Sequence, residues 1–133
     1  MNYRHQFSLP LDREISYAVK VMREAGIETY ESCEGGPGHS FTEPTIRFYG
    51  GPSEGLRAVS IALLYGLPVF SLRRFWSVLG EELSGPNWEM TFFPRERLVL
   101  VQRQAERAGL MMKKGPVHPP GADRPGNLLP LSV

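Results

Sequence analysis

Three segments of the chain carry apolar residues at the three- and four-residue spacing of an α-helix. They span residues 12–25, 53–65 and 95–108. Gly26 and Gly66 follow the first two segments, and a glycine at this position typically ends a helix. The predicted core-facing residues are Ile15, Ala18, Val19, Met22 and Ala25 in the first segment, Leu56, Val59, Leu63 and the neighbouring alanines in the second, and Leu98, Val101, Ala105 and Ala108 in the third.

Four segments enriched in β-branched and aromatic residues predict β-strands. The predicted strands span residues 27–33, 44–50, 67–76 and 86–94, and residues 77–85 (SVLGEELSG) are predicted to form a loop between the last two. In the last strand, Trp88, Met90 and Phe92 alternate with polar residues. Because side chains alternate between the two faces of a strand, these three residues should face the core together.

The same order of elements occurs twice along the chain. Each half begins with a residue suited to cap a helix, Asp12 or Ser53, and continues with a helix, a strand, a loop and a second strand. We interpret this order as a quasi-duplicated helix-strand-strand unit. It predicts an α+β two-layer sandwich, in which a four-stranded, mostly antiparallel sheet has both helices on one face.

The C-terminal part of the chain divides into a helix and a tail. The third predicted helix completes a single α+β domain over residues 1–108. Residues 109–133 are rich in proline and glycine, which is typical of an extended tail. The apolar LLPL sequence in this tail is suited to docking on a second copy, so we predict that a homo-oligomer can form through the tail.

Composition and charge exclude several classes of protein. The chain has 133 residues, enough to bury the core of one domain, and its formal net charge of +1 provides no field to attract nucleic acid or a membrane surface. A single cysteine forms no internal disulfide, which agrees with a reducing compartment. Neither a secretory signal nor a run of about 20 apolar residues occurs. We therefore predict a cytoplasmic protein that associates with no membrane, and we do not favour nucleic acid as a partner.

Residues 31–41, ESCEGGPGHSF, combine the only cysteine of the chain with three glycines, a proline and a histidine. The simplest interpretation is a turn between two strands. In that case Gly35, Gly36 and Gly38 supply positive φ angles. Cys33 is then a small buried hydrophobic side chain.

A second interpretation of this segment is a ligand-binding loop, and it is the one we favour. Successive glycines expose backbone N–H groups that can surround a phosphate or a carboxylate. Aromatic rings at Tyr30, Phe41 or Tyr49 are placed to stack on a ring of the ligand. We predict a small anionic, nucleotide-like ligand, or a host protein, bound by Cys33, Gly35, Gly36, Gly38 and His39, with Arg47 in support.

A third interpretation is catalysis by Cys33 and His39. A cysteine thiolate is a nucleophile when a neighbouring histidine acts as its base. The imidazole would be oriented by a nearby carboxylate, Glu31, Glu34 or Glu43. A metal centre is not predicted, because the cysteine and the three histidines of the chain match no zinc-binding spacing. No cofactor is predicted either.

Two other basic segments suggest further surfaces. The run SLRRFW, residues 71–76, interleaves arginine and aromatic residues as single-strand nucleic-acid sites do. The net charge favours instead one solvated arginine and aromatic residues in the core. The third helix carries Arg95, Arg97, Arg103 and Arg107 on its outer face, which we predict to be a solvated surface. A protein-interaction inhibitor that uses this helix and the tail is a further hypothesis.

The segment GIETYESCEGGPGHSFTEPTIRFYG resembles small proteins of bacteriophages and mobile elements. The shared pattern is SC-x-G-G-x-G-H-x-F-x-x-P-T-[IV]-R-F, and the resemblance extends to WEMTF, so that it covers residues 12–93. No activity is established for that group. The resemblance implies a small protein that sequesters a ligand or blocks a host factor.

Overall fold

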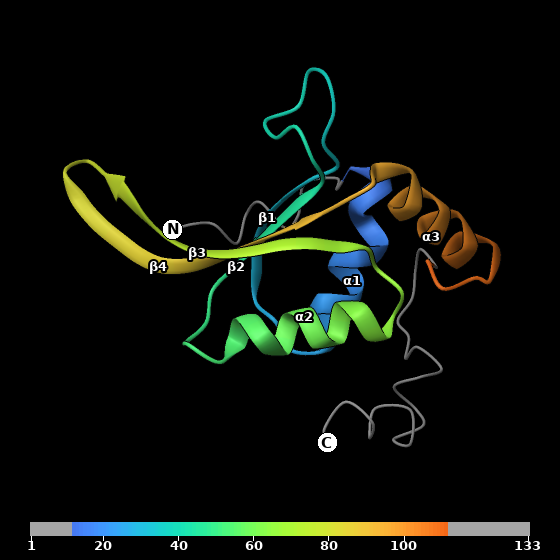
Figure 1. Ribbon diagram of the computed structural model, residues 1–133, viewed down its shortest axis with the longest axis horizontal. Coiled ribbons are helices and arrows are strands. Elements are labelled where there is room, and N and C mark those ends of the chain that lie inside the picture. The colour runs from blue at the N-terminus through green and yellow to red at the C-terminus, as the bar shows by residue number, and fades with distance from the viewer. Residues whose placement is uncertain (1–11, 112–133) are drawn as a thin grey trace.

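The computed structural model describes residues 12–111 (Figure 1). Within this range the three helices and four strands expected from the sequence are present, together with a short 3-10 helix. The tail from residue 112 onward, with the assembly predicted for it, lies outside the described residues. In chain order the elements are η2 (Arg13–Ile15), α1 (Ser16–Glu24), β1 (Thr29–Cys33), β2 (Thr45–Phe48), α2 (Glu54–Leu64), β3 (Val69–Leu79), β4 (Glu82–Phe92) and α3 (Arg95–Arg107).

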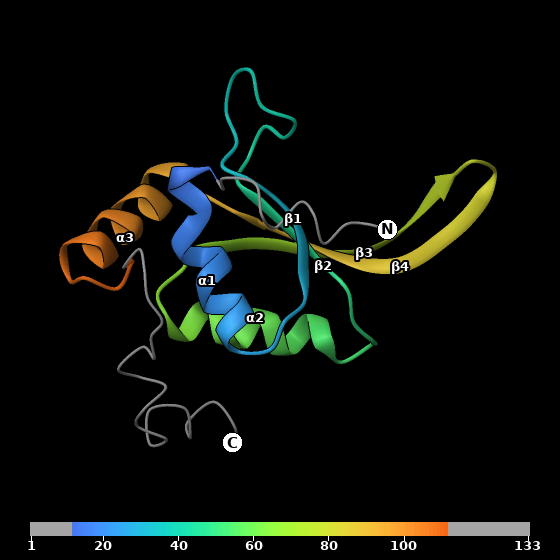
Figure 2. The same ribbon diagram turned by 180° about the vertical axis from the view of Figure 1, so that it is seen from behind.

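The four strands form one antiparallel sheet in the order β1-β2-β4-β3. Each half of the chain therefore contributes one central strand and one edge strand. Helices α1 and α2 lie on the same face of the sheet, and α3 lies near one end of it (Figures 1 and 2). This arrangement confirms the predicted α+β architecture. The duplication of a helix-strand-strand unit stays a prediction.

One continuous core lies between the sheet and the helices. The predicted inner face of the first helix is confirmed, because Ile15, Ala18, Val19 and Met22 are all buried. The sheet and α3 contribute Ile46, Phe48, Met90, Phe92 and Leu98 to the same core, and Trp88 packs against it.

No helix within residues 12–111 has the length and apolar character needed to cross a membrane.

Helix α2 packs on the sheet through only part of the face that the sequence predicts. The alanines at positions 58 and 62 are buried and Val59 packs against the core, as expected. Leu56 and Leu63 were expected in the core, but they are 70% and 57% exposed. A Cβ atom on Gly55 would lie 2.7 Å from ring carbons of Trp88. Because α2 approaches β4 so closely, mainly small side chains fit between them. The buried residues of α2 are Gly55, Ala58, Ile61 and Ala62.

Strands β3 and β4 form a longer hairpin than the sequence predicts. Residues 77–85, expected to be a loop, are paired for most of their length, with Val78 opposite Leu83. Only Gly80 and Glu81 form the turn, and both have positive φ angles, 55° and 73°. Positive φ at both central residues is the geometry of the tight hairpin turn. This turn lets the residues on both sides of it continue the two strands.

The helix boundaries agree with the sequence at their C-terminal ends but not in their caps. Gly26 and Gly66, which follow α1 and α2, have positive φ angles of 88° and 78°, as expected. Neither Asp12 nor Ser53 makes a capping hydrogen bond through its side chain. The carboxylate of Asp12 instead accepts a hydrogen bond from the backbone N–H of Glu34 at 3.0 Å. Asp12 therefore links the start of the first helix to the segment after β1.

Polar side chains attach α3 to the first helix, on a face that the sequence predicts to be solvated. The buried Gln102 accepts a hydrogen bond at 2.8 Å from a backbone N–H in the first turn of α1. Arg103 pairs with Glu14, and Arg13 pairs with Glu106 at 2.8 Å. A hydrogen bond from Arg13 and a weaker contribution from Gln102 lower the pKa of the Glu106 carboxyl to about 2. These contacts hold α3 against η2 and α1.

Candidate binding surfaces

The face of the sheet opposite α1 and α2 carries polar side chains in two rows. Antiparallel partners point to the same face, so the register alone places one residue from each strand in each row. The charged row consists of Glu31, Arg47, Glu89 and Arg73. The hydroxyl row consists of Thr45, Thr91 and Ser71, and Cys33 stands at its end.

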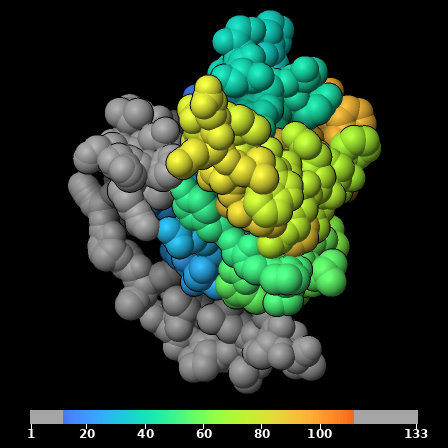
Figure 3. All heavy atoms as spheres, turned by 90° about the vertical axis from the view of Figure 1, so that its left-hand side faces the viewer, coloured from blue at the N-terminus to red at the C-terminus, as the bar shows by residue number. Residues whose placement is uncertain are grey.

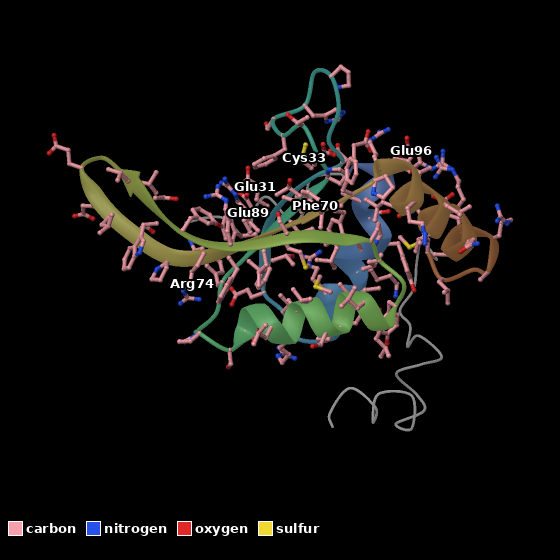
Figure 4. All side chains as sticks on the ribbon, in the orientation of Figure 1. Glu31, Cys33, Phe70, Arg74, Glu89 and Glu96 are labelled. Carbon is pink, nitrogen blue, oxygen red and sulfur yellow. The ribbon has the colours of Figure 1, made fainter. Side chains whose placement is uncertain are left out.

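Figure 4 shows the two faces of the sheet with their side chains. The labelled Glu31, Cys33 and Glu89 lie on the side away from α2, whereas Arg74 points to the side of α2. Arg74 lies over the ring of Trp88, with 4.5 Å between the guanidinium carbon and the ring centre. The two neighbouring arginines of SLRRFW therefore lie on opposite faces of the sheet. Of the two, Arg73 belongs to the face opposite α1 and α2, which we call the open face.

Glu89 is the centre of the charged row. It accepts hydrogen bonds from Nε of Arg47 at 3.0 Å and from Nε of Arg73 at 2.9 Å. Arg47 also donates to Glu31 at 3.2 Å. Burial alone would raise the pKa of the Glu89 carboxyl, but the hydrogen bonds from Arg73 and Arg47 outweigh it and lower that pKa below its ordinary value. The ionised carboxylate therefore holds both guanidinium groups in place.

Two phenylalanine rings enclose Arg47. Its guanidinium carbon lies 4.9 Å from the ring centre of Phe41 and 4.5 Å from that of Phe75. The guanidinium carbon of Arg73 is 5.3 Å from the same Phe75 ring. Cations over aromatic faces attract the ring electrons. The sequence indicates that Arg73 and Phe75 share a face, but it does not place them or Glu89 beside Arg47.

The glycine-rich loop, residues 34–44, projects from the sheet on the side away from α2 (Figures 1 and 3). Gly35, Gly36 and Gly38 have positive φ angles of 80°, 103° and 84°. At Gly35 the chain also passes close to itself, because a Cβ atom there would lie 2.6 Å from the backbone N of Pro44. Conformation and close packing therefore account for these glycines without a ligand.

Several backbone N–H groups of this loop donate hydrogen bonds within the protein. Gly36 donates to the carbonyl of Thr42 at 2.9 Å, and His39 donates to the carbonyl of Gly36 at 3.1 Å. The N–H of Gly35 points to Sγ of Cys33 at 3.4 Å. A nest that binds an anion needs N–H groups directed at the ligand. These three N–H groups therefore point at atoms of the protein itself.

Cys33 and His39 come together at the base of the loop, as the catalytic hypothesis requires. Ligand atoms of Asp12, Cys33 and His39 all lie within 4.8 Å of one another. Nδ1 of His39 is 3.6 Å from Asp12, and Nε2 is 3.5 Å from Glu34. Within residues 12–111 no hydrogen bond joins His39 to the buried Cys33, although an activated thiol needs its base within hydrogen-bond reach. Of the two carboxylates beside the histidine, the sequence indicates Glu34 but not Asp12.

The predicted stacking residues are divided among different surroundings. Tyr30 and Tyr49 stack on each other, with 4.4 Å between ring centres. Tyr30 is also buried. Phe41 lies over Arg47. Of the three predicted rings, Phe41 therefore contacts the charged row, through Arg47.

The outer part of the β3–β4 hairpin extends beyond the rest of the sheet (Figure 1). We call residues 76–86 the hairpin arm. Strand β2 pairs with β4 only from Trp88 to Thr91, and β3 is an edge strand. Within the described residues, neither long edge of the arm is therefore paired with a third strand. Four large apolar side chains on the arm are each more than half exposed: Trp76, Val78, Leu79 and Leu83.

The exposure of Trp76 corrects the expectation that the aromatic residues of SLRRFW belong to the core. Phe75 is half-buried beside Arg47 on the open face, and Trp76 is 56% exposed. The pairing of β3 with β4 is irregular between Phe75 and Ser77, which places Trp76 at a bulge.

No known protein family, curated protein or solved structure matches this chain.

Proposed function

We propose that this chain is a binding protein that engages a protein partner through the hairpin arm. The exposure of Trp76, Val78, Leu79 and Leu83 on one projecting ribbon carries the proposal. Val78 and Leu83 stand directly opposite each other on the two strands. Figure 3 views the molecule from the side to which this hairpin extends, and the loop stands above it. A partner that approaches the arm therefore also meets the loop side of the molecule.

The physical chemistry of the arm favours a protein as its partner. A two-stranded ribbon alone is only marginally stable in water. Covering its apolar side chains with a second surface lowers the free energy. Tryptophan is among the residues that most often dominate protein interfaces. The unpaired backbone groups along the edges of the arm offer hydrogen bonds to an added strand.

This proposal keeps the predicted role of blocking a host factor but moves the contact from the glycine-rich loop to the arm. The resemblance to small phage and mobile-element proteins also supports a binding role. The alternative interface predicted on α3 has weaker support. Arg103 and Arg95 of that helix already contact Glu14 and Glu34 of the same chain.

Photo-crosslinking in the cells that naturally produce the protein tests this proposal. A photoreactive amino acid replaces Glu82, an exposed residue at the tip of the arm. We expect a crosslinked product with one other protein, detected by mass spectrometry. Trp76→Ala should reduce the yield, because loss of a central tryptophan costs an interface about 2 kcal/mol or more, roughly thirty-fold in affinity.

The matched control carries the same photoreactive group at Glu96, which is exposed on α3. Its products should lack the partner captured from the arm. Equal capture from both positions, or no product from the arm, would contradict the proposal. If the crosslinked product contains only a second copy of this chain, the arm mediates self-association, and the proposal of a different protein partner is wrong.

The charged row favours a second candidate function, the binding of a small anionic ligand. The side chain of Arg73 is 58% exposed, and its guanidinium group lies beside the ring of Phe75. An exposed guanidinium donates hydrogen bonds to phosphate or carboxylate groups, and an adjacent ring is suited to stacking. This candidate retains Arg47 from the predicted ligand site but exchanges the loop glycines for side chains of the sheet.

Adenosine monophosphate and adenosine provide a test of this second function, because they differ only in the phosphate group. By isothermal titration calorimetry we expect the monophosphate to bind at least ten-fold more tightly than the nucleoside. Arg73→Gln should weaken binding of the monophosphate by about 1.5–3 kcal/mol, the usual contribution of a hydrogen bond to a charged group. Arg57→Gln on α2 is the matched control, and an equal loss there would contradict the assignment.

A further inference from the structure

Three different metal-ligating side chains converge at the base of the glycine-rich loop. They come from separate parts of the sequence: Asp12 precedes η2, Cys33 ends β1, and His39 lies within the loop. Their ligand atoms lie within 4.8 Å of one another. In a tetrahedral zinc site each ligand atom is about 2.0–2.3 Å from the metal. Two ligand atoms of such a site therefore lie closer to each other than 4.8 Å. A small closing movement of the exposed His39 would complete that geometry.

The histidine has the surroundings of a metal ligand. Nδ1 of His39 faces Asp12 at 3.6 Å, while Nε2 faces Glu34 at 3.5 Å on the other side of the ring. A histidine that binds a metal through one nitrogen almost always donates its other N–H to a carboxylate or a carbonyl. Glu34 is suited to that role and leaves Nδ1 directed at Asp12.

Other hydrogen bonds hold these side chains in position. One oxygen of Glu34 accepts a hydrogen bond from the backbone N–H of Glu14 at 3.0 Å. The carboxylate of Asp12 accepts one from the backbone N–H of Glu34 at 3.0 Å. Sγ of Cys33 accepts a hydrogen bond from the backbone N–H of Gly35 at 3.4 Å. The cluster is therefore supported by the backbone on both sides.

We propose that Asp12, Cys33 and His39 bind a Zn²⁺ ion, with Glu34 orienting His39. Thiolate, imidazole and carboxylate together suit zinc better than magnesium or calcium, which prefer oxygen ligands. Three protein ligands leave a fourth position for water or for a group of a bound partner. The ion would join the start of the first helix to the loop after β1, and thereby fix the loop on the open face of the sheet.

Spectroscopic titration of the full chain with Co²⁺, a zinc substitute, tests this proposal. A thiolate bound to Co²⁺ gives a charge-transfer band in the near ultraviolet. The chain has a single cysteine, so such a band can arise only from Cys33. We expect one Co²⁺ per chain, with this band, and its displacement by Zn²⁺. Binding should also raise the melting temperature in proportion to the logarithm of the metal concentration.

Four variants separate the proposed roles. Cys33→Ala should abolish the charge-transfer band, and His39→Ala and Asp12→Asn should each weaken Co²⁺ binding at least ten-fold. Glu34→Gln should keep the band but weaken binding by about 10–100-fold, the usual effect of removing a partner of a metal-bound histidine. Since His39 is exposed, His39→Ala should remain folded even where Cys33→Ala does not.

Two controls exclude unrelated binding. Glu82→Gln removes a carboxylate on the hairpin arm and should leave Co²⁺ affinity unchanged. Replacement of both His5 and His118, which lie outside the described residues, should likewise have no effect. The proposal is overturned by the lack of a charge-transfer band at one equivalent of Co²⁺, by unchanged affinity in His39→Ala, or by loss of binding in the double histidine variant.

Discussion

Glu89→Gln should lower the free energy of unfolding by about 3 kcal/mol. The side chain of Glu89 is only 9% exposed, and it is the shared acceptor for Arg47 and Arg73. Glutamine preserves the shape but removes the charge, so two guanidinium groups are left without their common carboxylate. Breaking a buried ion pair on one side is costly because the remaining charge stays desolvated, and this applies to Arg47, whose side chain is only 23% exposed. Urea denaturation monitored by circular dichroism measures the difference.

Glu31→Gln is the matched control for this prediction. Glu31 belongs to the same charged row, but its side chain is 39% exposed, and its one ion pair within residues 12–111 is with Arg47 at 3.2 Å. An exposed ion pair contributes about 0–1 kcal/mol, so the control should lose no more than that. If both variants lose the same free energy, Glu89 is not the centre of the row.

The same carboxylate predicts how stability depends on pH. The pKa of Glu89 is lower in the folded protein than its ordinary value, despite burial, because of the hydrogen bonds from Arg73 and Arg47. A lowered folded-state pKa stabilises the protein above the unfolded pKa of about 4.3, and this contribution is lost as the pH falls. The difference in stability between the wild-type chain and Glu89→Gln should therefore shrink as the pH falls below about 4.3.

Gly35→Ala is expected to be the most destabilising single change in the loop, at about 3 kcal/mol. Two costs add there. Alanine is strained at a φ of 80°, and its Cβ would lie 2.6 Å from backbone atoms of Glu43 and Pro44. The left-handed conformation costs about 1–2 kcal/mol, and forcing packed atoms apart costs about 1–3 kcal/mol. Thermal and urea unfolding of the variant measure the sum.

Gly38→Ala isolates the conformational part of that cost. Gly38 has a similar φ of 84°, but a Cβ atom there would meet no other atom within 4 Å. We expect a loss of about 1 kcal/mol, because only the backbone conformation is strained. Equal losses at Gly35 and Gly38 would mean that the two ends of the loop do not pack as closely as the structure indicates.

Local patterns were sufficient to predict most of the secondary structure. The inner face of the first helix follows from apolar spacing, because one side of a helix that packs on a sheet must be apolar. Gly26 and Gly66 mark helix ends, because the chain there adopts positive φ angles of 88° and 78°. The alternation in β4 places Met90 and Phe92 in the core, since strand side chains alternate between faces.

Two predictions are wrong, one because of a distant residue and one because of the conformation of a turn. The prediction that leucines line the inner face of α2 is wrong, because Trp88, 33 positions after Gly55, admits only small side chains there. Leu56 and Leu63 fit the helical spacing equally well but lie exposed. The segment 77–85 was misassigned because its composition is typical of a loop, whereas the two-residue turn at Gly80 and Glu81 lets it pair.

The sequence by itself determined which residues were candidates for the loop, and the tertiary structure decided which of them become neighbours. Cys33 and His39 were recognisable because they lie six positions apart. Asp12 joins them only because the first helix packs beside the end of β1, where the N–H of Glu34 reaches its carboxylate.

The charged row depends even more strongly on tertiary structure. Arg47 and Glu89 are 42 positions apart, and they meet because β4 pairs with β2 on one edge and with β3 on the other. Strand register is set by which faces can be buried across the whole sheet. A single sequence contains the alternating pattern of each strand but not the order in which the strands pair, so this surface was decided only by the folded chain.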